Sequence, residues 1–297
     1  MNDTKEKKHI APNECSILRW FLVLLIGFGG GTIALAPLEP FLKNTTDTIL
    51  GITYKDFFGL LSFVPMFILT VIALKFVAKT SVKDFILGVG GTVNKKLALI
   101  ILGLYAFGMI LPYLLTIGNV SFRGVDPAQY AFLIFFNLLI LWMQTTFEEF
   151  IFRGLFLRWA CKNEIGYSKK AMLAAVVSSL VFMAAHLFNP EITSQSGIDI
   201  VLAASSYFIS GFACAWVDLH FKSLVPGIVI HWCNNFILSV IISQNVSALT
   251  NPTLLIDATP KIALWDMIST ILVYLPVVIL IVCSFIKGKK TAPAEKQ

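Results

Sequence analysis

The chain has 297 residues, of which 57% are hydrophobic and only 13% are charged, and its formal net charge is +6. A soluble domain carries roughly 25% charged residues, so this composition excludes a water-soluble globule. A soluble nucleic-acid-binding protein and a disulfide-built secreted module are excluded with it. We therefore predict an integral membrane protein, with the lipid bilayer as its surroundings.

Eight apolar stretches are long enough to cross a bilayer as helices, since a span takes about 20 residues. Only helices and closed barrels satisfy all backbone polar groups in lipid, and the alternating strands typical of a barrel are missing from the sequence. The predicted class is all-α and polytopic, with about eight transmembrane helices. The stretches are 17–38, 57–78, 97–119, 130–158, 171–189, 199–219, 224–243 and 264–286.

The first stretch follows a basic segment and has features of a signal peptide. Ala34-Leu35-Ala36 is similar to a cleavage site, but Pro37 would then occupy the first mature position, which disfavours cleavage. We interpret the stretch as a retained first span. Within it, the spacing Gly27-x-x-x-Gly31 predicts close packing against another helix.

The lysines and arginines predict the orientation, because cytoplasmic loops are enriched in them. With the N-terminus inside, 18 of the 23 lie in cytoplasmic segments. The opposite side holds only Lys43, Lys55, Arg123 and Lys261, and Arg153 lies within a span. Both termini are predicted to be cytoplasmic, and the Lys-rich, loop-poor character favours a bacterial cytoplasmic membrane.

The sequence has no repeat of 20–50 residues and no long polar linker, so residues 1–297 are predicted to form one membrane domain. Basic cytoplasmic tails occupy 1–16 and 287–297, and a motif-bearing core occupies 130–243. The glycines at 88, 90 and 91 lie in a loop without a strand–helix context or a Walker lysine. No nucleotide and no nucleic acid is expected as a partner.

Glu148 and Glu149 are the acids that lie deep within an apolar stretch. A lone carboxylate at that depth costs about 3 kcal/mol on insertion scales, so it must be paired or functional. Glu149 and Arg153 are spaced i,i+4 with the acid first, the favoured order for an ion pair. Glu148 projects about 100° away around the helix. We therefore predict a structural role for Glu149 and proton chemistry for Glu148.

Two further stretches bring polar side chains to membrane depth. His186 follows Phe182 by four residues, and His231 precedes Asn235 by four, which places each pair on one helix face. A lone histidine in a span most often makes a helix–helix hydrogen bond. Three stretches that each carry an acid, an imidazole or an amide favour a shared polar cavity instead. Counted from the drawn ends, Glu148 lies nearer the inner side and His186 nearer the outer, so they meet only if a helix tilts, breaks or starts later.

The three motifs together resemble the signatures of the CAAX protease and bacteriocin-processing family of intramembrane proteases. These motifs are Glu148-Glu149-x-x-x-Arg153, Phe182-x-x-x-His186 and His231-x-x-x-Asn235, and they extend over about 148–235. The family, also called the Abi family, includes the type II prenyl-protein endopeptidases. The resemblance implies peptide-bond hydrolysis near the cytoplasmic face, on a prenylated C-terminus or a membrane-embedded peptide.

The residues themselves also favour a hydrolase. Glu148 is the candidate general base, and His186 can help to orient or deprotonate a water. His231 and Asn235 are candidate donors to the oxyanion of a tetrahedral intermediate, and Glu149, Arg153 and Phe182 are expected to support the site. A metal remains open, because Glu148, His186 and His231 are possible Zn²⁺ ligands with water in the fourth position. We prefer the metal-free mechanism without a cofactor, since Asn235 is a better oxyanion donor than zinc ligand.

Two other classes of function stay open at this stage. Members of the family that the chain resembles are associated with bacteriocin self-immunity, so a non-catalytic immunity or scaffolding protein is one alternative. A proton-coupled transporter is the other, but paired broken helices and inverted repeats are not evident in the sequence.

Overall fold

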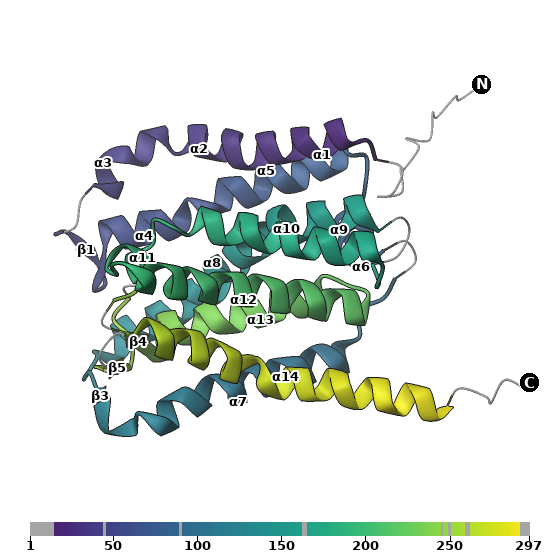
Figure 1. The fold of residues 1–297 in the computed structure, drawn as a ribbon. Helices are drawn as coiled ribbons and strands as arrows, with labels where there is room; N and C mark the ends of the chain where they lie inside the picture. The colour runs from purple at the N-terminus through teal and green to yellow at the C-terminus, as the bar shows by residue number, and fades with distance from the viewer. Residues whose placement is uncertain are drawn as a thin grey trace, which may run out of the picture.

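The structure is a computed structural model and describes residues 15–43, 46–88, 91–161, 165–244, 246–248, 251–258 and 262–291. Most of these residues lie in helices that run alongside one another in a single bundle (Figure 1). The all-α, polytopic class predicted from the sequence is confirmed. Residues 1–14 and 292–297, which make up most of the two predicted tails, lie outside the described residues.

The first flank of the bundle is one apolar segment packed against a long helix. The segment comprises α1 (Ile17–Leu24), the π-helical turn η2 (Leu25–Gly30), α2 (Gly31–Ala34), the 3₁₀ turn η3 (Ala36–Leu38) and α3 (Glu39–Leu42). A short hairpin, β1 (Thr48–Ile49) and β2 (Ile52–Thr53), leads into α4 (Tyr54–Leu61) and α5 (Phe63–Phe76).

The predicted close packing at Gly27 and Gly31 is present in the structure. Both glycines face α5, where an added Cβ would collide with Thr70 and Met66 respectively. The absence of side chains lets the two backbones approach, which is how small residues stabilise helix pairs in lipid.

The opposite flank pairs α7 (Lys95–Leu115) with α14 (Ala263–Thr291). Gly108 of α7 lies against the backbone of Val273 in α14. The short α6 (Val82–Leu87) precedes this flank in the chain. Between the flanks lie the helices that carry the three motifs, as Figure 1 shows.

The motif-bearing helices begin with the longest continuous helical segment, Pro127–Ala160. It consists of α8 (Pro127–Glu149), the π-helical turn η5 (Phe150–Gly154) and α9 (Leu155–Ala160). The others are α10 (Lys169–Ala185), the short α11 (Pro190–Thr193), α12 (Ile198–Phe221), α13 (Val225–Phe236) and its π-helical extension η6 (Ile237–Ile241).

A small sheet closes one end of the bundle. Its strand order is β3 (Val120–Phe122), β5 (Leu255–Asp257) and β4 (Ile242–Gln244), and a 3₁₀ turn, η4 (Ile117–Asn119), precedes β3. β5 pairs antiparallel with β3 and parallel with β4. We call this end, with the five strands and α11, the strand end. The end where α1 begins and α14 ends is the basic end (Figure 1).

Helices occupy all eight predicted stretches, but six of them, among the described residues, are long and apolar enough to cross a membrane. The helix Val225–Ile241 is shorter, and α10 has 17 residues. Seventeen residues rise about 26 Å, slightly less than the roughly 30 Å hydrocarbon core. Many large apolar side chains on the outer helices are exposed, as lipid-facing surfaces require.

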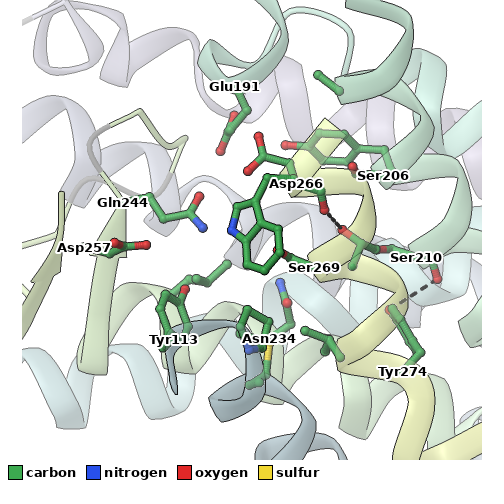
Figure 2. A pocket seen from close by; sticks show the side chains of 18 of the residues that line it. Tyr113, Glu191, Ser206, Ser210, Asn234, Gln244, Asp257, Asp266, Ser269 and Tyr274 are labelled. Carbon is green, nitrogen blue, oxygen red and sulfur yellow. Dashed lines mark hydrogen bonds between the residues drawn. The ribbon is translucent and has the colours of Figure 1, made fainter. Parts of the chain in front are cut away.

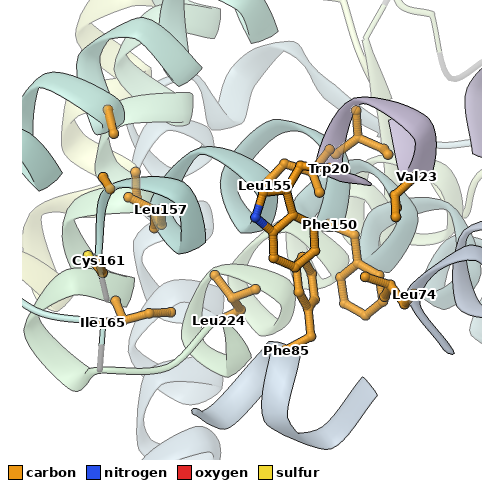
Figure 3. Close-up of a cluster of buried hydrophobic side chains, with 14 of the residues drawn as sticks. Trp20, Val23, Leu74, Phe85, Phe150, Leu155, Leu157, Cys161, Ile165 and Leu224 are labelled. Carbon is orange, nitrogen blue, oxygen red and sulfur yellow. The ribbon is translucent and has the colours of Figure 1, made fainter. Parts of the chain in front are cut away.

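The largest apolar cluster lies next to the π-helical turn that follows Glu149 (Figure 3). Phe150 of η5 packs edge-on against Phe85 of α6, with ring centroids 5.1 Å apart. Phe85 in turn contacts Trp20 of α1 at 5.6 Å. Two elements from the N-terminal third of the chain, α1 and α6, therefore pack beside the turn that directly follows the two glutamates.

Candidate active site

Glu148 and Glu149 end α8, and the structure buries both carboxylates, with 6% and 0% of each residue exposed. Glu149 Oε1 lies 3.2 Å from Arg153 Nη1, so the ion pair predicted from the i,i+4 spacing is present. The same oxygen accepts a hydrogen bond from His231 Nδ1 at 2.8 Å. Glu149 is thus held by partners on two different helices.

Glu148 points to a different set of groups. Its Oε1 accepts a hydrogen bond from Gln144 Nε2 at 3.3 Å, and its Oε2 lies 3.4 Å from His231 Nε2. The His231 ring therefore lies between the two glutamates and presents one nitrogen to each. A ring that donates from Nδ1 to Glu149 can donate to a second group from Nε2 only when both nitrogens carry hydrogen.

Arg153 and Phe182 form an aromatic and cationic layer beside this group. The Arg153 guanidinium carbon lies 3.9 Å from the centre of the Phe182 ring, a cation–π contact. Phe182 also contacts both imidazoles, with centroid distances of 4.2 Å to His186 and 5.8 Å to His231. The three residues expected to support the site, Glu149, Arg153 and Phe182, are therefore in mutual or shared contact.

His186 lies immediately after the end of α10. Its Nδ1 lies 2.7 Å from the Phe182 carbonyl oxygen. Since a carbonyl only accepts, Nδ1 donates this bond, and a neutral ring then carries its lone pair on Nε2. The ring also stacks on Tyr207 of α12, with centroids 4.8 Å apart. The hydrogen bond from Nδ1 thus leaves Nε2 as the acceptor nitrogen of His186, and the stacking holds the ring in place.

Asn235 is 8% exposed, and its amide is oriented by two residues that sequence reasoning missed. Asn234 Nδ2 donates to Asn235 Oδ1 at 3.1 Å, and Tyr105 of α7 donates its hydroxyl hydrogen to Asn234 Oδ1 at 3.1 Å. With its oxygen occupied, Asn235 keeps its NH₂ group as the available donor. Adjacent asparagines are the only sequence signal for this arrangement, because Tyr105 comes from a distant helix.

One cavity of about 150 Å³ is lined by all four candidate catalytic residues, Glu148, His186, His231 and Asn235. Arg153 and Phe182 also line it, together with Gln144, Tyr207 and Asn234. Hydropathy placed Glu148 and His186 at different depths, but in the bundle both line this one cavity. The α10 helix ends at Ala185, and the turn that follows places His186 beside the helices that carry Glu148 and His231.

Glu148, His186 and His231 are the possible Zn²⁺ ligands named from the sequence. Each histidine donates its Nδ1 hydrogen to an oxygen acceptor, an arrangement that also suits metal ligands. However, within the part of the chain that the structure describes, His, Cys, Asp and Glu side chains form no group of three or more that could hold a metal ion. Glu148, His186 and His231 line one cavity but do not form such a group in this arrangement.

Sequence reasoning also missed buried acids near helix ends. Asp218, near the end of α12, is fully buried, and its Oδ1 accepts a hydrogen bond from Gly227 N at 2.7 Å. Glu191 of α11 lines the cavity. Both residues stand at or beyond the edge of an apolar stretch, where a charged residue is usually solvated, so hydropathy carried no signal for the burial of Asp218 or for Glu191 at the cavity.

Comparison with known proteins adds one finding. Residues 130–237 match the family model described as "Type II CAAX prenyl endopeptidase Rce1-like". A comparison with curated proteins found no match. The matched segment contains Glu148, His186, His231 and Asn235, and it covers α8 to α13. Residues 130–237 are therefore similar to the Rce1-like type II CAAX prenyl endopeptidases, and this match confirms the resemblance indicated by the three motifs.

Proposed function

We propose that this chain is an intramembrane endopeptidase that hydrolyses a peptide bond in a membrane-embedded peptide or a prenylated C-terminus. The observation that carries the proposal is the cavity that Glu148, His186, His231 and Asn235 line together, within the segment that matches the endopeptidase family. Residues 130–243 act as the catalytic core of one membrane domain.

In the proposed reaction, Glu148 is the general base. Gln144 holds one oxygen of its carboxylate, and the other oxygen faces the ring of His231. A water in the cavity gives a proton to Glu148 and attacks the substrate carbonyl. His186 accepts a hydrogen bond from this water through Nε2, because its Nδ1 is committed to the Phe182 carbonyl. A positioned base contributes roughly 10²–10⁴-fold to the rate.

Asn235 and His231 stabilise the oxyanion that forms. The Asn235 NH₂ group is the first donor, since Asn234 occupies its oxygen. His231 is the second candidate donor, and its Nδ1 is used by Glu149. It therefore donates from Nε2 only when both ring nitrogens carry hydrogen. The same Nε2 hydrogen can then pass to the leaving amine.

The side of the membrane from which substrate enters follows from the location of the cavity. Its lining includes Asn189, Ser247 and Ala248, which belong to segments at the strand end (Figure 1). With both termini in the cytoplasm, as the Lys and Arg distribution predicts, the strand end faces away from the cytoplasm. This orientation supports cleavage toward the extracytoplasmic face, whereas the family resemblance implies cleavage near the cytoplasmic face. We infer entry from the extracytoplasmic side.

Purified protein incubated with a labelled single-span peptide and a prenylated CAAX-type peptide tests the proposal, with products read by mass spectrometry. We expect cleavage of one substrate class, and loss of it in Glu148→Gln. Glu39→Gln is the matched control, because Glu39 is an exposed acid that pairs with Lys43 at the surface. Folded protein that cleaves neither substrate would contradict the proposal and leave the immunity or transport alternatives.

The metal-free form of the mechanism has its own test. Active protein analysed for bound transition metals should contain them at far less than one per chain, and chelation should leave cleavage unchanged. One tightly held zinc per chain, with activity lost on its removal and restored on its return, would refute the metal-free mechanism and leave the protease proposal standing.

A further inference from the structure

A second and larger cavity, of about 220 Å³, adjoins the candidate active site (Figure 2). It lies toward the strand end, between α7, α12 and α14, with β4 and β5 at its edge. We call it the side chamber. Its lining shares six residues with the lining of the catalytic cavity: Glu191, Tyr207, Ser210, Asn234, Leu238 and Tyr274. The two cavities therefore lie next to each other, with these six residues at their boundary.

The charge of the side chamber is of one sign. Glu191, Asp257 and Asp266 line it from three separate elements, and the lining contains no Lys, Arg or His among the described residues. Figure 2 shows these acids around the same space, with Gln244 between Asp257 and Glu191. A substrate carboxylate placed here would be repelled, whereas a cation would be attracted.

The walls and the unpaired oxygens of the side chamber favour the same kind of ligand. Aromatic rings line the space, and the faces of such rings attract cations. The rings belong to Tyr105, Tyr113, Tyr207, Trp265 and Tyr274. Three buried oxygens lack a hydrogen-bond partner within the described residues: Glu191 Oε2, Ser206 Oγ and Ser269 Oγ. Buried polar atoms are nearly always satisfied, so these oxygens are positioned to accept hydrogen bonds from a ligand.

An apolar lipid chain would match only the apolar part of this lining. Burying a prenyl group here would place hydrocarbon against three acids and several hydroxyl groups, which would lose their solvation without gaining a partner. A lysine or arginine side chain supplies what the space lacks, since it has several N–H donors, a positive charge and no acceptor.

We propose that the side chamber is a substrate subsite that takes a lysine or arginine side chain of the peptide, a few residues from the bond that is cut. This inference rests on the proposed function, because it assumes that a peptide occupies the neighbouring cavity. It assigns to Asp266, Asp257 and Glu191 the selection of cationic peptides over neutral or acidic ones.

The test separates binding from cleavage. The probe is a labelled single-span peptide that carries Lys, Gln or Glu at one position, scanned along its flanking segment. Its affinity is measured with the Glu148→Gln protein, and its cleavage with the unaltered protein. We expect the Lys peptide to bind about tenfold more tightly than the Gln peptide at the best position, and the Glu peptide to bind more weakly still.

Substitutions in the chamber give the second part of the test. Asp266→Asn should remove most of the preference for Lys, and Asp266→Lys should reverse it toward the Glu peptide. Asp257→Asn provides the same measurement if Asp266 variants fold poorly. Asp199→Asn is the matched control, since Asp199 is an exposed acid in the first turn of α12 and lines neither cavity.

The two proposals fail in different ways. Equal binding of all three peptides to folded protein, or a Lys preference that survives both aspartate substitutions, would overturn the subsite. A Lys preference in binding without cleavage of any peptide would keep the subsite and overturn the protease. Cleavage without any charge preference would keep the protease and overturn the subsite alone.

Discussion

Two neighbouring glutamates on α8 have different surroundings because a helix turns adjacent side chains about 100° apart. Glu149 faces Arg153 and His231 in a fully buried position, and Glu148 faces the cavity beside Gln144. Glu149 is thus part of a buried ion pair, whereas Glu148 is the candidate base. Mutation of each should therefore change a different measured quantity.

Replacement of Glu149 by glutamine should act on stability. Removal of one partner of a buried pair leaves the other charge alone, which typically costs about 3–5 kcal/mol. We expect Glu149→Gln to lower the folded yield and the thermal midpoint in detergent, whereas Glu39→Gln at the exposed pair with Lys43 should change neither. Full stability combined with complete loss of cleavage would mean that the roles of the two acids are exchanged.

Replacement of Asn235 should act on the transition state. Loss of one oxyanion donor costs roughly 10²–10³-fold in kcat, and we expect Asn235→Ala to lower kcat by that factor with a much smaller change in KM. Tyr105→Phe removes the outer bond to Asn234 and should have an effect of the same kind but smaller. A rise in KM at constant kcat in Asn235→Ala would assign Asn235 to substrate binding instead.

At the scale of elements, three helices of the bundle contain a π-helical turn, and one of them, Phe150–Gly154, directly follows Glu149. Such turns are frequent at functional sites. The wider turn does not break the ion pair between Glu149 and Arg153. Phe150 belongs to the same turn and packs into the largest apolar cluster. This π-helical turn therefore connects the candidate site to that cluster.

The packing of α2 against α5 can be tested with two glycines in the same segment. An added Cβ at Gly31 would collide with Met66, including its backbone, whereas at Gly29 the nearest atom is Leu25 Cδ1 at 3.5 Å, an ordinary contact. We expect Gly31→Ala to destabilise the protein by about 1–3 kcal/mol through overpacking, and Gly29→Ala to leave the thermal midpoint nearly unchanged. Equal effects of the two would show that this contact does not hold the flank.

For the molecule as a whole, the two ends of the bundle differ in charge and in content. The basic end holds most of the lysines and arginines, and the strand end holds the sheet and the side chamber. The positive-inside rule predicts that the basic end is cytoplasmic. The proposed entry of substrate from the extracytoplasmic side depends on this orientation.

Orientation can be measured in intact cells. A fluorescent protein fused after Gln297 should fold and fluoresce in the cytoplasm. In a background without native cysteines, Ser196→Cys, in an exposed loop at the strand end, should react with a membrane-impermeant thiol reagent added outside. Labelling of Ser196→Cys only after the membrane is opened would place the strand end in the cytoplasm and contradict the proposed route of entry.

The sequence by itself determined the class, the helical stretches and the chemistry-bearing motifs, because each depends on local properties. Hydropathy over about 20 residues indicates a span, and the i,i+4 spacing predicted the contact between Glu149 and Arg153. Hydropathy did not locate the helix ends. The stretch 171–189 counted His186 and the turn after it as part of a span, whereas α10 ends at Ala185.

Only the tertiary structure decided how the motifs meet. His231 lies between two glutamates that precede it by more than 80 residues, and Tyr105 orients an amide on a helix that follows it by 129 residues. The side chamber depends on acids from α11, β5 and α14, each unremarkable in its own segment. Spacing along a helix reports only one face of that helix, so contacts between helices, and the cavities that they enclose, follow from the packing of the whole bundle.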